Sequence, residues 1–445
     1  MNFPIEFENR MKSMLGNEYN AFLAAFDAEN IHKAVRVNSQ KEIPEELKGI
    51  LSTLEPVKWC KTGYYTDKDI LDGNSPYHLG GLLYFQEPSA MAVVSAITIN
   101  PDDYVLDLCA APGGKATHAG EFIGEGGLLV ANEIVKKRAV ILADNIERMG
   151  IKNAVVTNES PKRLEERFPE FFNKIIVDAP CSGEGMFRKE PQAVEEWSVS
   201  HTEACATRQK LILDSAMKML APGGELIYST CTFAPCENEG VVDYILKNYP
   251  DIELVPITLH GLSPAVSAWA ESETDMKGAK RIFPHHQKGE GHFLALFRKR
   301  GEFVKKAEKI SKKEPAEAKL YREFEKEFLK ISLSGRFELF GENLYLAPEG
   351  IDLNKLKVER AGLFLGKCRK GRFEPSHALA LALKRSNFVN TYEAEDIKKY
   401  LRGETLEADI RGWCAVTYQG IPLGWAKGSQ GILKNHFPKY MRVLK

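Results

Sequence analysis

Short apolar runs, separated by stretches with helical periodicity, dominate the middle of the chain. Five such runs stand out, at residues 104–109, 127–132, 153–158, 174–178 and 225–229. Strands that alternate with helices at this spacing predict a parallel, doubly wound sheet of the α/β class. Such sheets bind their ligands beyond the carboxyl ends of the strands. The residues that directly follow each run are therefore the candidates for chemistry.

The segments on either side of this region have a different pattern. Residues 1–80 combine helical periodicity with a short extended piece, which predicts a small α/β cap. After Arg300, the stretch 305–319 is rich in Lys, Glu and Ala and indicates a linker or an exposed helix. The tail is rich in β-forming residues, and a Gln419-Gly420 turn between two apolar runs predicts a hairpin. We therefore expect four units, at residues 1–80, 81–300, 301–383 and 384–445.

Length and composition agree with several folded domains. The chain has 445 residues, of which 44% are hydrophobic and 27% are charged. No apolar run approaches the roughly 20 residues that span a bilayer, and the first residues lack the pattern of a secretion signal. Eight thinly spread cysteines then indicate free thiols in a cytoplasmic protein. The net charge of -1 means that any surface that binds nucleic acid through basic residues must be local.

A loop of small residues follows the first run of the predicted sheet. Its sequence, Asp-Leu-Cys-Ala-Ala-Pro-Gly-Gly-Lys over 107–115, lets a ligand approach the backbone and the positive end of the next helix. A phosphate-binding P-loop would need other residues where the chain has Cys109 and Ala116, and the dinucleotide fingerprint is also missing. Glu133 ends the next run and can accept hydrogen bonds from both hydroxyls of a ribose. The pattern favours S-adenosylmethionine, although a tight turn that serves packing alone would look similar.

Two cysteines follow two other runs. Cys181 lies just after the run that ends at Asp178, and Cys231 lies just after the run that ends at Ser229. In a parallel sheet both thiols would project into one cleft beside the cofactor. A thiolate that adds to carbon 6 of a pyrimidine makes carbon 5 nucleophilic enough to take a methyl group. A second thiol nearby could assist the release of the product.

Less specific roles are open to the cysteines of this chain. A buried cysteine commonly packs as a small hydrophobic side chain. Five cysteines are assigned to that role: Cys60, Cys109, Cys205, Cys368 and Cys414. Zinc is the other alternative, but no C-x-x-C pair occurs, and Cys231 with Cys236 lacks a matching second pair. We therefore expect no metal site.

Taken together, these motifs resemble the Sun-type RNA cytosine-5 methyltransferases, most closely the bacterial, RsmF-like branch that acts on 16S ribosomal RNA. The matching segments are 81–90, 107–115, 178–183, 229–231 with its Glu-Asn-Glu trailer, and 283–293. In that family the Thr-Cys thiol is the nucleophile and the Pro-Cys thiol helps to release the product. The resemblance implies Cys231 as the nucleophile and Cys181 as the assisting thiol, on a Rossmann-like methyltransferase sheet. DNA cytosine methyltransferases use the Pro-Cys thiol instead, so the presence of both cysteines favours RNA.

The resemblance also implies the residues that hold the substrate and the cofactor. Lys115 and Asp178 match the residues that hold the target cytosine, and Asp178 also borders the cofactor. Glu133 matches the acid at the ribose. The rest of the cofactor cradle matches Cys109, Ala110, Ala111, Pro112, Gly113, Gly114 and Lys115. Where the family usually has an Asp near the adenine, this chain has Asn158-Glu159, so Glu159 is the candidate and Asn158 the alternative.

Two basic stretches near the C-terminus could bind RNA. Residues 355–373 carry seven Lys and Arg against one Glu, and residues 427–445 carry five with His436, Phe437 and Tyr440 among them. Basic side chains beside aromatic rings can neutralise phosphates and stack on bases, although either stretch could be only a solvated charged face. The last unit resembles the PUA-like module of the same branch.

These features together predict a cytoplasmic, monomeric enzyme with 16S rRNA or the small ribosomal subunit as partner and with no DNA or membrane partner. Two alternatives stay open. The same chemistry could act on transfer RNA, because substrate choice lies in the flanking domains. A ribosome-assembly factor that binds RNA without catalysis is the other, and the two intact cysteines with Asp178 and Glu133 argue against it.

Overall fold

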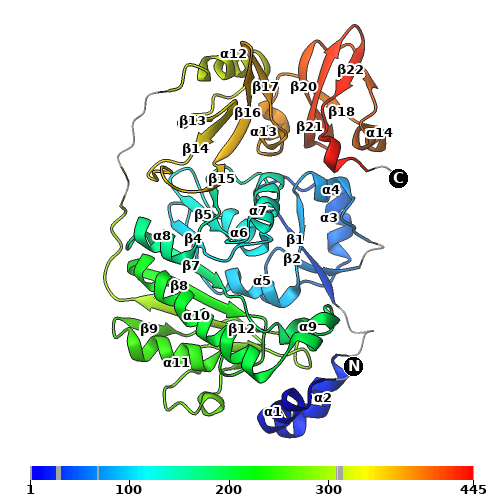
Figure 1. The fold of residues 1–445 in the computed structure, drawn as a ribbon. Helices are drawn as coiled ribbons and strands as arrows, with labels where there is room; N and C mark the ends of the chain where they lie inside the picture. The colour runs from blue at the N-terminus through cyan, green and yellow to red at the C-terminus, as the bar shows by residue number, and fades with distance from the viewer. Residues whose placement is uncertain (1–2, 27–31, 68–69, 307, 309–313, 444–445) are drawn as a thin grey trace.

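The computed structural model describes residues 3–26, 32–67, 70–306, 308 and 314–443. Its largest sheet has ten strands, in the order β10-β11-β12-β8-β7-β4-β5-β6-β15, with β9 paired to β12 (Figure 1). The five central strands are β4 (Tyr104–Asp107), β5 (Leu128–Asn132), β6 (Ala154–Thr157), β7 (Phe172–Asp178) and β8 (Leu220–Thr230). They run parallel and coincide with the five predicted runs, which confirms that prediction. The strand order reverses between β4 and β7, where this fold binds its ligands.

Helices cover both faces of this sheet because its strands bury side chains in both directions. Leu106 packs into a core with α8 (Pro161–Arg167), α10 (Val199–Met219) and α11 (Glu239–Asn248), whereas its neighbour Val105 faces the opposite core. That second core is formed with helices α5 (Pro88–Ser95), α6 (Gly114–Gly120) and α7 (Lys136–Arg148). Successive side chains of a strand point to opposite faces. The doubly wound, Rossmann-like architecture is thereby confirmed.

Antiparallel strands extend the sheet at both edges, which the sequence pattern did not predict. At one edge β12 (His292–Lys299) pairs with β8, followed by β11 (Lys280–Ile282) and β10 (Ser263–Pro264), while β9 (Ile252–Val255) also pairs with β12. At the other edge β15 (Val358–Ala361) pairs with β6. Strand β15 lies some two hundred residues after its partner, so no local periodicity links the two. The segment 301–383 therefore contributes a strand to the methyltransferase sheet.

The N-terminal cap consists of a helical pair and a small antiparallel sheet. The helical elements are α1 (Ile5–Leu15), η1 (Gly16–Glu18) and α2 (Tyr19–Ala24). The sheet has the order β2-β1-β3, with β1 (Lys33–Val37), β2 (Gly63–Thr66) and β3 (Leu83–Phe85), and is accompanied by α3 (Glu45–Ser52) and α4 (Pro76–Leu79). Aromatic residues of the helical pair pack against Phe187, Trp197, Phe233 and Phe283 of the central domain. The cap is thus bound to the methyltransferase sheet through a shared core.

Two further sheets make up the C-terminal part. The first contains β13 (Arg336–Phe340), β14 (Asn343–Ala347), β16 (Leu363–Arg369) and β17 (Arg372–Pro375), with α12 (Ala318–Phe328) and α13 (His377–Leu381). The second contains β18 (Thr391–Glu393), β20 (Gly412–Tyr418), β21 (Ile421–Ser429), β22 (Ile432–Asn435) and β19 (Leu406–Glu407), with α14 (Ile397–Arg402).

The predicted hairpin is confirmed in the second of these sheets. Strands β20 and β21 pair antiparallel, and both turn residues have positive φ, 49° at Gln419 and 80° at Gly420. A two-residue turn with two left-handed residues suits the twist of the strands. Part of the predicted linker, at residues 307 and 309–313, lies outside the described residues. Within the described ranges, no helix has both the length and the apolar character required to cross a membrane.

Candidate active site

The two cysteines that the sequence singles out meet at the carboxyl ends of adjacent strands. Cys181 lies in the loop after β7 and Cys231 directly follows β8, and these strands pair in parallel with Asp178 opposite Ser229. The two Sγ atoms are 3.3 Å apart. Both side chains are only partly buried. The strand order thus brings together two thiols that are 50 residues apart in the chain.

The loops that carry the thiols are in close contact. The Gly185 N–H donates to the Cys231 carbonyl at 2.8 Å, and a Cβ on Gly185 would lie only 2.9 Å from that oxygen. Gly183 has a φ of 71°, a backbone conformation that side chains other than glycine rarely adopt. Glycines therefore let the loop after β7 lie against the Cys231 backbone.

The Glu-Asn-Glu trailer after Cys231 braces both loops. Buried Glu237 accepts hydrogen bonds from the Ser182 N–H at 3.0 Å and the Ser182 hydroxyl at 2.5 Å, so it holds the residue next to Cys181. Asn238 accepts from the Thr230 hydroxyl at 2.6 Å, and Glu239 forms a buried ion pair with Arg281 at 2.5 Å. Burial raises the pKa of Glu237 to about 7, against the effect of its hydrogen bonds. The trailer is a structural support for the cysteine pair.

The two thiols share a hydrogen bond. The pKa of Cys181 is raised well above that of an ordinary thiol, first by the hydrogen bond with Cys231 and then by burial. Cys181 therefore keeps its proton and can donate it toward the Cys231 sulfur. The two sulfurs therefore lie in position for a hydrogen bond that Cys181 can donate.

A network of charged groups lies at the same ends of the strands. The Asp178 carboxylate contacts the Lys115 ammonium at 2.8 Å and accepts from the Ser229 hydroxyl at 2.7 Å, while Nε2 of His292 lies 3.8 Å from Oδ1. Burial by itself would raise the pKa of Asp178, but Lys115 and His292 outweigh it and hold that pKa well below its usual range. Asp178 is therefore ionised and fixed in position beside the two thiols. Sequence reasoning identified Lys115 and Asp178 but assigned no role to Ser229 or His292.

The small-residue loop between β4 and α6 forms a cradle next to this network. Gly113 has a φ of 118°, and a Cβ there would lie 3.2 Å from the Leu142 side chain, so the turn requires glycine. The α7 side chains Arg138 and Asn145 donate to the carbonyls of Ala111 and Pro112 at 2.9 and 2.8 Å. The loop is thus held from outside, which leaves its inner side to a ligand.

A buried carboxylate at the base of the loop indicates what kind of ligand fits. Both oxygens of Asp107 are buried and have no hydrogen-bond partner among the described residues. Burial raises the pKa of Asp107 to about 8. A buried acceptor without a donor is costly, and a cationic ligand that donates hydrogen bonds would satisfy it. S-adenosylmethionine, with its ammonium and sulfonium groups, fits this requirement.

The acids at the ends of β5 and β6 are both placed near the loop. Glu133 is buried, with Oε1 accepting from the Val135 N–H at 2.8 Å and Oε2 lying 3.1 Å from Arg138. Glu159 is also buried, but its carboxylate accepts from the Lys357 N–H at 2.9 Å just before β15. The Asn158 amide donates to the Glu133 carbonyl at 2.7 Å. Glu159 therefore anchors the C-terminal segment, a contact that no local pattern could predict.

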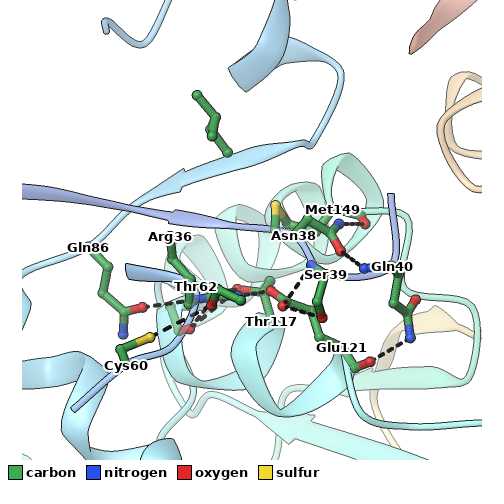
Figure 2. A network of polar contacts seen from close by, with 12 residues as sticks. Arg36, Asn38, Ser39, Gln40, Cys60, Thr62, Gln86, Thr117, Glu121 and Met149 are labelled. Atoms are coloured by element: carbon green, nitrogen blue, oxygen red, sulfur yellow. Dashed lines mark hydrogen bonds and ion pairs between the residues drawn. The ribbon is translucent and has the colours of Figure 1, made fainter. Parts of the chain in front are cut away.

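A polar network that sequence reasoning missed joins the cap to the cofactor loop. Arg36 of β1 donates to the Thr117 hydroxyl at 2.9 Å and to the Gly114 carbonyl at 3.3 Å, and it forms a buried ion pair with Glu121 (Figure 2). Glu121 in turn accepts from the Ser39 N–H at 3.2 Å. Burial lowers the pKa of Arg36 to about 10. The sequence signal of this contact is an arginine between two valines in the predicted extended piece of the cap.

Parts of the two basic stretches do not face solvent, so their interpretation as RNA-binding surfaces is wrong at these positions. Arg360 of β15 is 1% exposed and lies 3.6 Å from Glu147, because its strand completes the sheet. Phe437 is 2% exposed and packs in a core with Tyr400, so it cannot stack on a base. Three lysines of the last stretch, Lys427, Lys434 and Lys439, are exposed. Lys445 lies outside the described residues.

The histidine pair after Phe283 packs between the cap and the central domain. The His285 side chain is 4% exposed, lies against Phe22 and contacts Glu18 through Nε2 at 3.3 Å. His286 contacts the same carboxylate at 3.1 Å. Both histidines therefore serve packing and a shared contact with Glu18.

The parallel strand order, the glycine loop after β4 and the acid at the end of β5 define a Rossmann-like methyltransferase that uses S-adenosylmethionine. Comparison with known proteins gives the family. Four family models match successive parts of the chain: the 16S rRNA methyltransferase RsmB/F over residues 94–298, the N-terminal domain of 16S rRNA methyltransferase RsmF over 3–88, the RsmF rRNA methyltransferase first C-terminal domain over 323–383, and the methyltransferase RsmF PUA domain over 388–443.

Relatives of this family are similar over nearly the whole chain. The ribosomal RNA small subunit methyltransferase F of Shewanella piezotolerans is 32% identical, over 93% of this chain and 92% of the relative. That of Escherichia coli O139:H28 is 31% identical, over 98% and 96%. The chain therefore belongs to the RsmF family of 16S rRNA methyltransferases, as its motifs predicted.

Solved structures agree with the fold of the central part. A methyltransferase homologue from Pyrococcus horikoshii is 28% identical with a TM-score of 0.59, over 67% of this chain and 96% of that one. NSun6 from the same organism, solved with the cofactor analogue SFG, has a TM-score of 0.58 at 23% identity, over 67% and 99%. The second likeness shows the fold alone.

Proposed function

We propose that this protein methylates carbon 5 of a cytosine in 16S ribosomal RNA, through a covalent bond between Cys231 and carbon 6. The observation that carries the proposal is the pair of thiols 3.3 Å apart beside the Asp178–Lys115 ion pair. One thiol alone could be structural, but a donor thiol, an acceptor thiol and a fixed carboxylate together suit nucleophilic addition to a ring. The family relatives carry the name ribosomal RNA small subunit methyltransferase F, which supports the choice of RNA.

In the first half of the reaction, the Cys231 thiolate forms a bond to carbon 6 of the cytosine. The electron pair of the 5,6 double bond then moves toward carbon 5, which becomes nucleophilic. Lys115 and Asp178 are proposed to hold the polar edge of the base, with Lys115 as hydrogen-bond donor and Asp178 as acceptor. The bound cofactor supplies an electrophilic methyl group, and carbon 5 takes it.

In the second half, carbon 5 gives its proton to solvent water and the bond between carbon 6 and sulfur breaks. The electron pair of the broken carbon–hydrogen bond restores the double bond, and Cys231 leaves as a thiolate. Cys181 is proposed to assist this release, because its sulfur lies at hydrogen-bond distance from that of Cys231. It donates a hydrogen bond to the departing thiolate.

The cofactor is proposed to lie along the loop from Cys109 to Lys115. Glu133, at the end of β5, would accept from the ribose hydroxyls, and Asp178 would border the reacting methyl group. Asp107 adds a carboxylate without a partner at the base of the same loop. The Glu159 carboxylate accepts from Lys357, whereas the Asn158 amide contacts the backbone of Glu133, so Asn158 is the side chain proposed near the adenine.

The two cysteines should respond differently to replacement. Cys231→Ala removes the attacking sulfur, so both methyl transfer and the covalent RNA adduct should be lost. Cys181→Ala leaves the attack possible but impairs release, so the protein should remain attached to RNA as a band that resists denaturation in gel electrophoresis. Cys205→Ala, at a buried cysteine of α10, is the matched control and should methylate normally.

The assay should supply labelled methyl donor with 16S RNA, 30S particles and transfer RNA from a strain that lacks the enzyme, and nucleoside analysis should locate the label. We expect 5-methylcytosine in 16S RNA or in the particles. An adduct with Cys231→Ala and none with Cys181→Ala would reverse the two roles. Label in transfer RNA alone would identify transfer RNA, and not 16S RNA, as the substrate. The absence of label in every RNA would favour a non-catalytic assembly factor.

A further inference from the structure

His292 lies behind the carboxylate that is proposed to hold the target base. It begins β12, and the next residue, Phe293, pairs with Thr230 in the ladder with β8. Continuing this antiparallel register by one position brings His292 alongside Cys231. Its side chain is 6% exposed, and Nε2 lies 3.8 Å from Oδ1 of Asp178.

The hydrogen bond on the other ring nitrogen defines the state of the imidazole. Nδ1 lies 2.8 Å from the carbonyl oxygen of Gly291, and because a carbonyl only accepts, Nδ1 carries a proton. Nε2 is buried without a hydrogen-bond partner within the described ranges. In the neutral ring, two acceptors, Nε2 and the Asp178 oxygen, would face each other. In the imidazolium form, Nε2 carries a proton and can donate it to Asp178.

Charged groups on neighbouring elements face the ring. Asp178, at the end of β7, faces Nε2, and Oε2 of Glu87, at the start of α5, lies 4.0 Å from Nδ1. Lys115 on α6 opposes these two carboxylates, but it is already paired with Asp178. Cys231 on the neighbouring strand adds a negative charge when it ionises. An Nε2–H on this ring would therefore point at a carboxylate oxygen.

We propose that His292, as an imidazolium, is a positioning residue that holds Asp178 against the target cytosine. Asp178 then has three donors: the Lys115 ammonium, the Ser229 hydroxyl and the His292 Nε2–H. The last contact closes from 3.8 Å to hydrogen-bond distance when the base is bound, as catalytic contacts often tighten in the complex. This inference rests on the proposed function, because it assigns Asp178 to the substrate.

Two substitutions separate this role from a merely structural one. His292→Asn keeps a donor for the Gly291 carbonyl but has no atom at the position of Nε2. His292→Gln places an amide N–H near the position of Nε2 and donates at every pH. Melting temperature and affinity for S-adenosylmethionine serve as controls for folding, and both should stay unchanged in the two variants.

Single-turnover methylation of 16S RNA should be measured against pH. The wild-type rate should fall on the alkaline side as His292 loses its proton, in addition to any acid limb from Cys231. His292→Asn should be slower by about 10- to 100-fold at neutral pH, the effect of one lost hydrogen bond to a charged group, and should lack the alkaline fall. His292→Gln should recover most of the rate, also without the alkaline fall. Equal rates for wild type and His292→Asn, or an alkaline fall that persists in it, would overturn the proposal.

A second measurement does not depend on methylation. Nuclear magnetic resonance of the protein labelled at histidine gives the pH midpoint of His292, assigned by its absence from His292→Asn. Replacing Asp178 with Asn removes the facing carboxylate and should lower that midpoint. An unchanged midpoint would contradict the contact whatever the substrate is. A wild type that makes no 5-methylcytosine while Asp178→Asn shifts the midpoint would defeat the proposed function and leave this pair intact.

Discussion

At the scale of single residues, chemistry here depends on which hydrogen-bond donor faces which acceptor. Cys181 and Cys231 are the same residue type on neighbouring loops, and the hydrogen bond that they share raises the pKa of Cys181. Asp107 is buried and Asp178 is half-buried, and both acids lie near Lys115. Their pKa values shift in opposite directions. Asp178 has donors and its pKa is depressed, whereas burial raises the pKa of Asp107.

The raised pKa of Glu237 should make the stability of the protein depend on pH. Its pKa is about 7 in the folded protein because it is buried, compared with 4.5 ordinarily. Between these values the folded state holds a proton that the unfolded state has lost, so the free energy of unfolding should fall as pH rises from about 4.5 to 7. The full effect of such a shift is on the order of 3 kcal/mol.

Glu237→Gln removes this titration. Urea unfolding at pH 5 and at pH 8 should show that the variant is destabilised less, relative to wild type, at the higher pH. The free energy of unfolding lost on substitution should differ between pH 5 and pH 8 by an amount that approaches the scale of about 3 kcal/mol implied by the pKa shift. Parallel pH dependence of wild type and variant would show that Glu237 does not titrate in this range.

At the scale of elements, the cofactor loop is positioned by elements that lie far from it in the sequence. Strand β1 of the cap holds the first turn of α6 through Arg36, as Figure 2 shows. On the other side, α7 holds the loop carbonyls through Arg138 and Asn145. A seven-residue helix such as α6 has little stability of its own. Its geometry therefore depends on these neighbours.

The buried pair of Arg36 and Glu121 should show this dependence. Arg36→Met leaves the Glu121 carboxylate buried without its cation, which should lower the free energy of unfolding by about 3 to 5 kcal/mol. It also frees the start of α6, so affinity for S-adenosylmethionine should fall. Chemical denaturation and calorimetry measure the two effects.

The double variant Arg36→Met with Glu121→Leu is the control. Because it removes the stranded charge as well, it should recover part of the stability that the single variant loses. If the stability lost in the double variant equals the sum of the losses in Arg36→Met and Glu121→Leu alone, the two side chains are not coupled. Recovered stability without recovered cofactor affinity would assign the affinity to the Arg36 bonds with Gly114 and Thr117.

At the scale of the whole molecule, hydrophobic cores cross the boundaries between the expected units. One core joins Val35 and Leu83 of the cap to Ile421 and Leu423 of the last sheet, and another joins α12 to Trp425. Figure 1 shows the last sheet next to helix α4 of the cap. Deleting the residues after 383 would therefore expose two cores. RNA binding by the tail has to be tested by changing surface charge instead.

Three exposed lysines of the last sheet provide this test. Lys427 and Lys434 are partners across β21 and β22, and Lys439 follows on a short 3-10 helix. Changing all three to Glu should weaken 16S RNA binding and reduce the slope of its salt dependence by about two to three, if each contacts one phosphate. Binding isotherms at several salt concentrations measure both quantities.

A matched triple variant, Lys162→Glu, Lys247→Glu and Lys277→Glu, changes the same charge on exposed residues of the central domain. It should affect RNA binding less and leave most of the slope in place. If the two triple variants have the same slope, net charge alone explains the effect and the tail has no specific role.

The sequence by itself determined the features that depend on neighbouring residues. Five buried strands, the glycine loop, the hairpin turn at Gln419-Gly420 and the two cysteines at strand ends all follow from local periodicity and turn chemistry. The parallel order of such strands then brought the thiols to one edge, because strands of one direction end on the same side of a sheet.

Only the tertiary structure decided which distant groups face each other. Arg360 reads as a basic surface residue but is buried, since β15 pairs with β6, and Glu159 is engaged by Lys357 for the same reason. His292 is one residue of the matching segment 283–293 in the sequence, whereas in the structure it lies behind Asp178. Contacts of this kind depend on strand pairings between residues tens to hundreds of positions apart, and on burial that changes pKa values. Local periodicity carries no information about either.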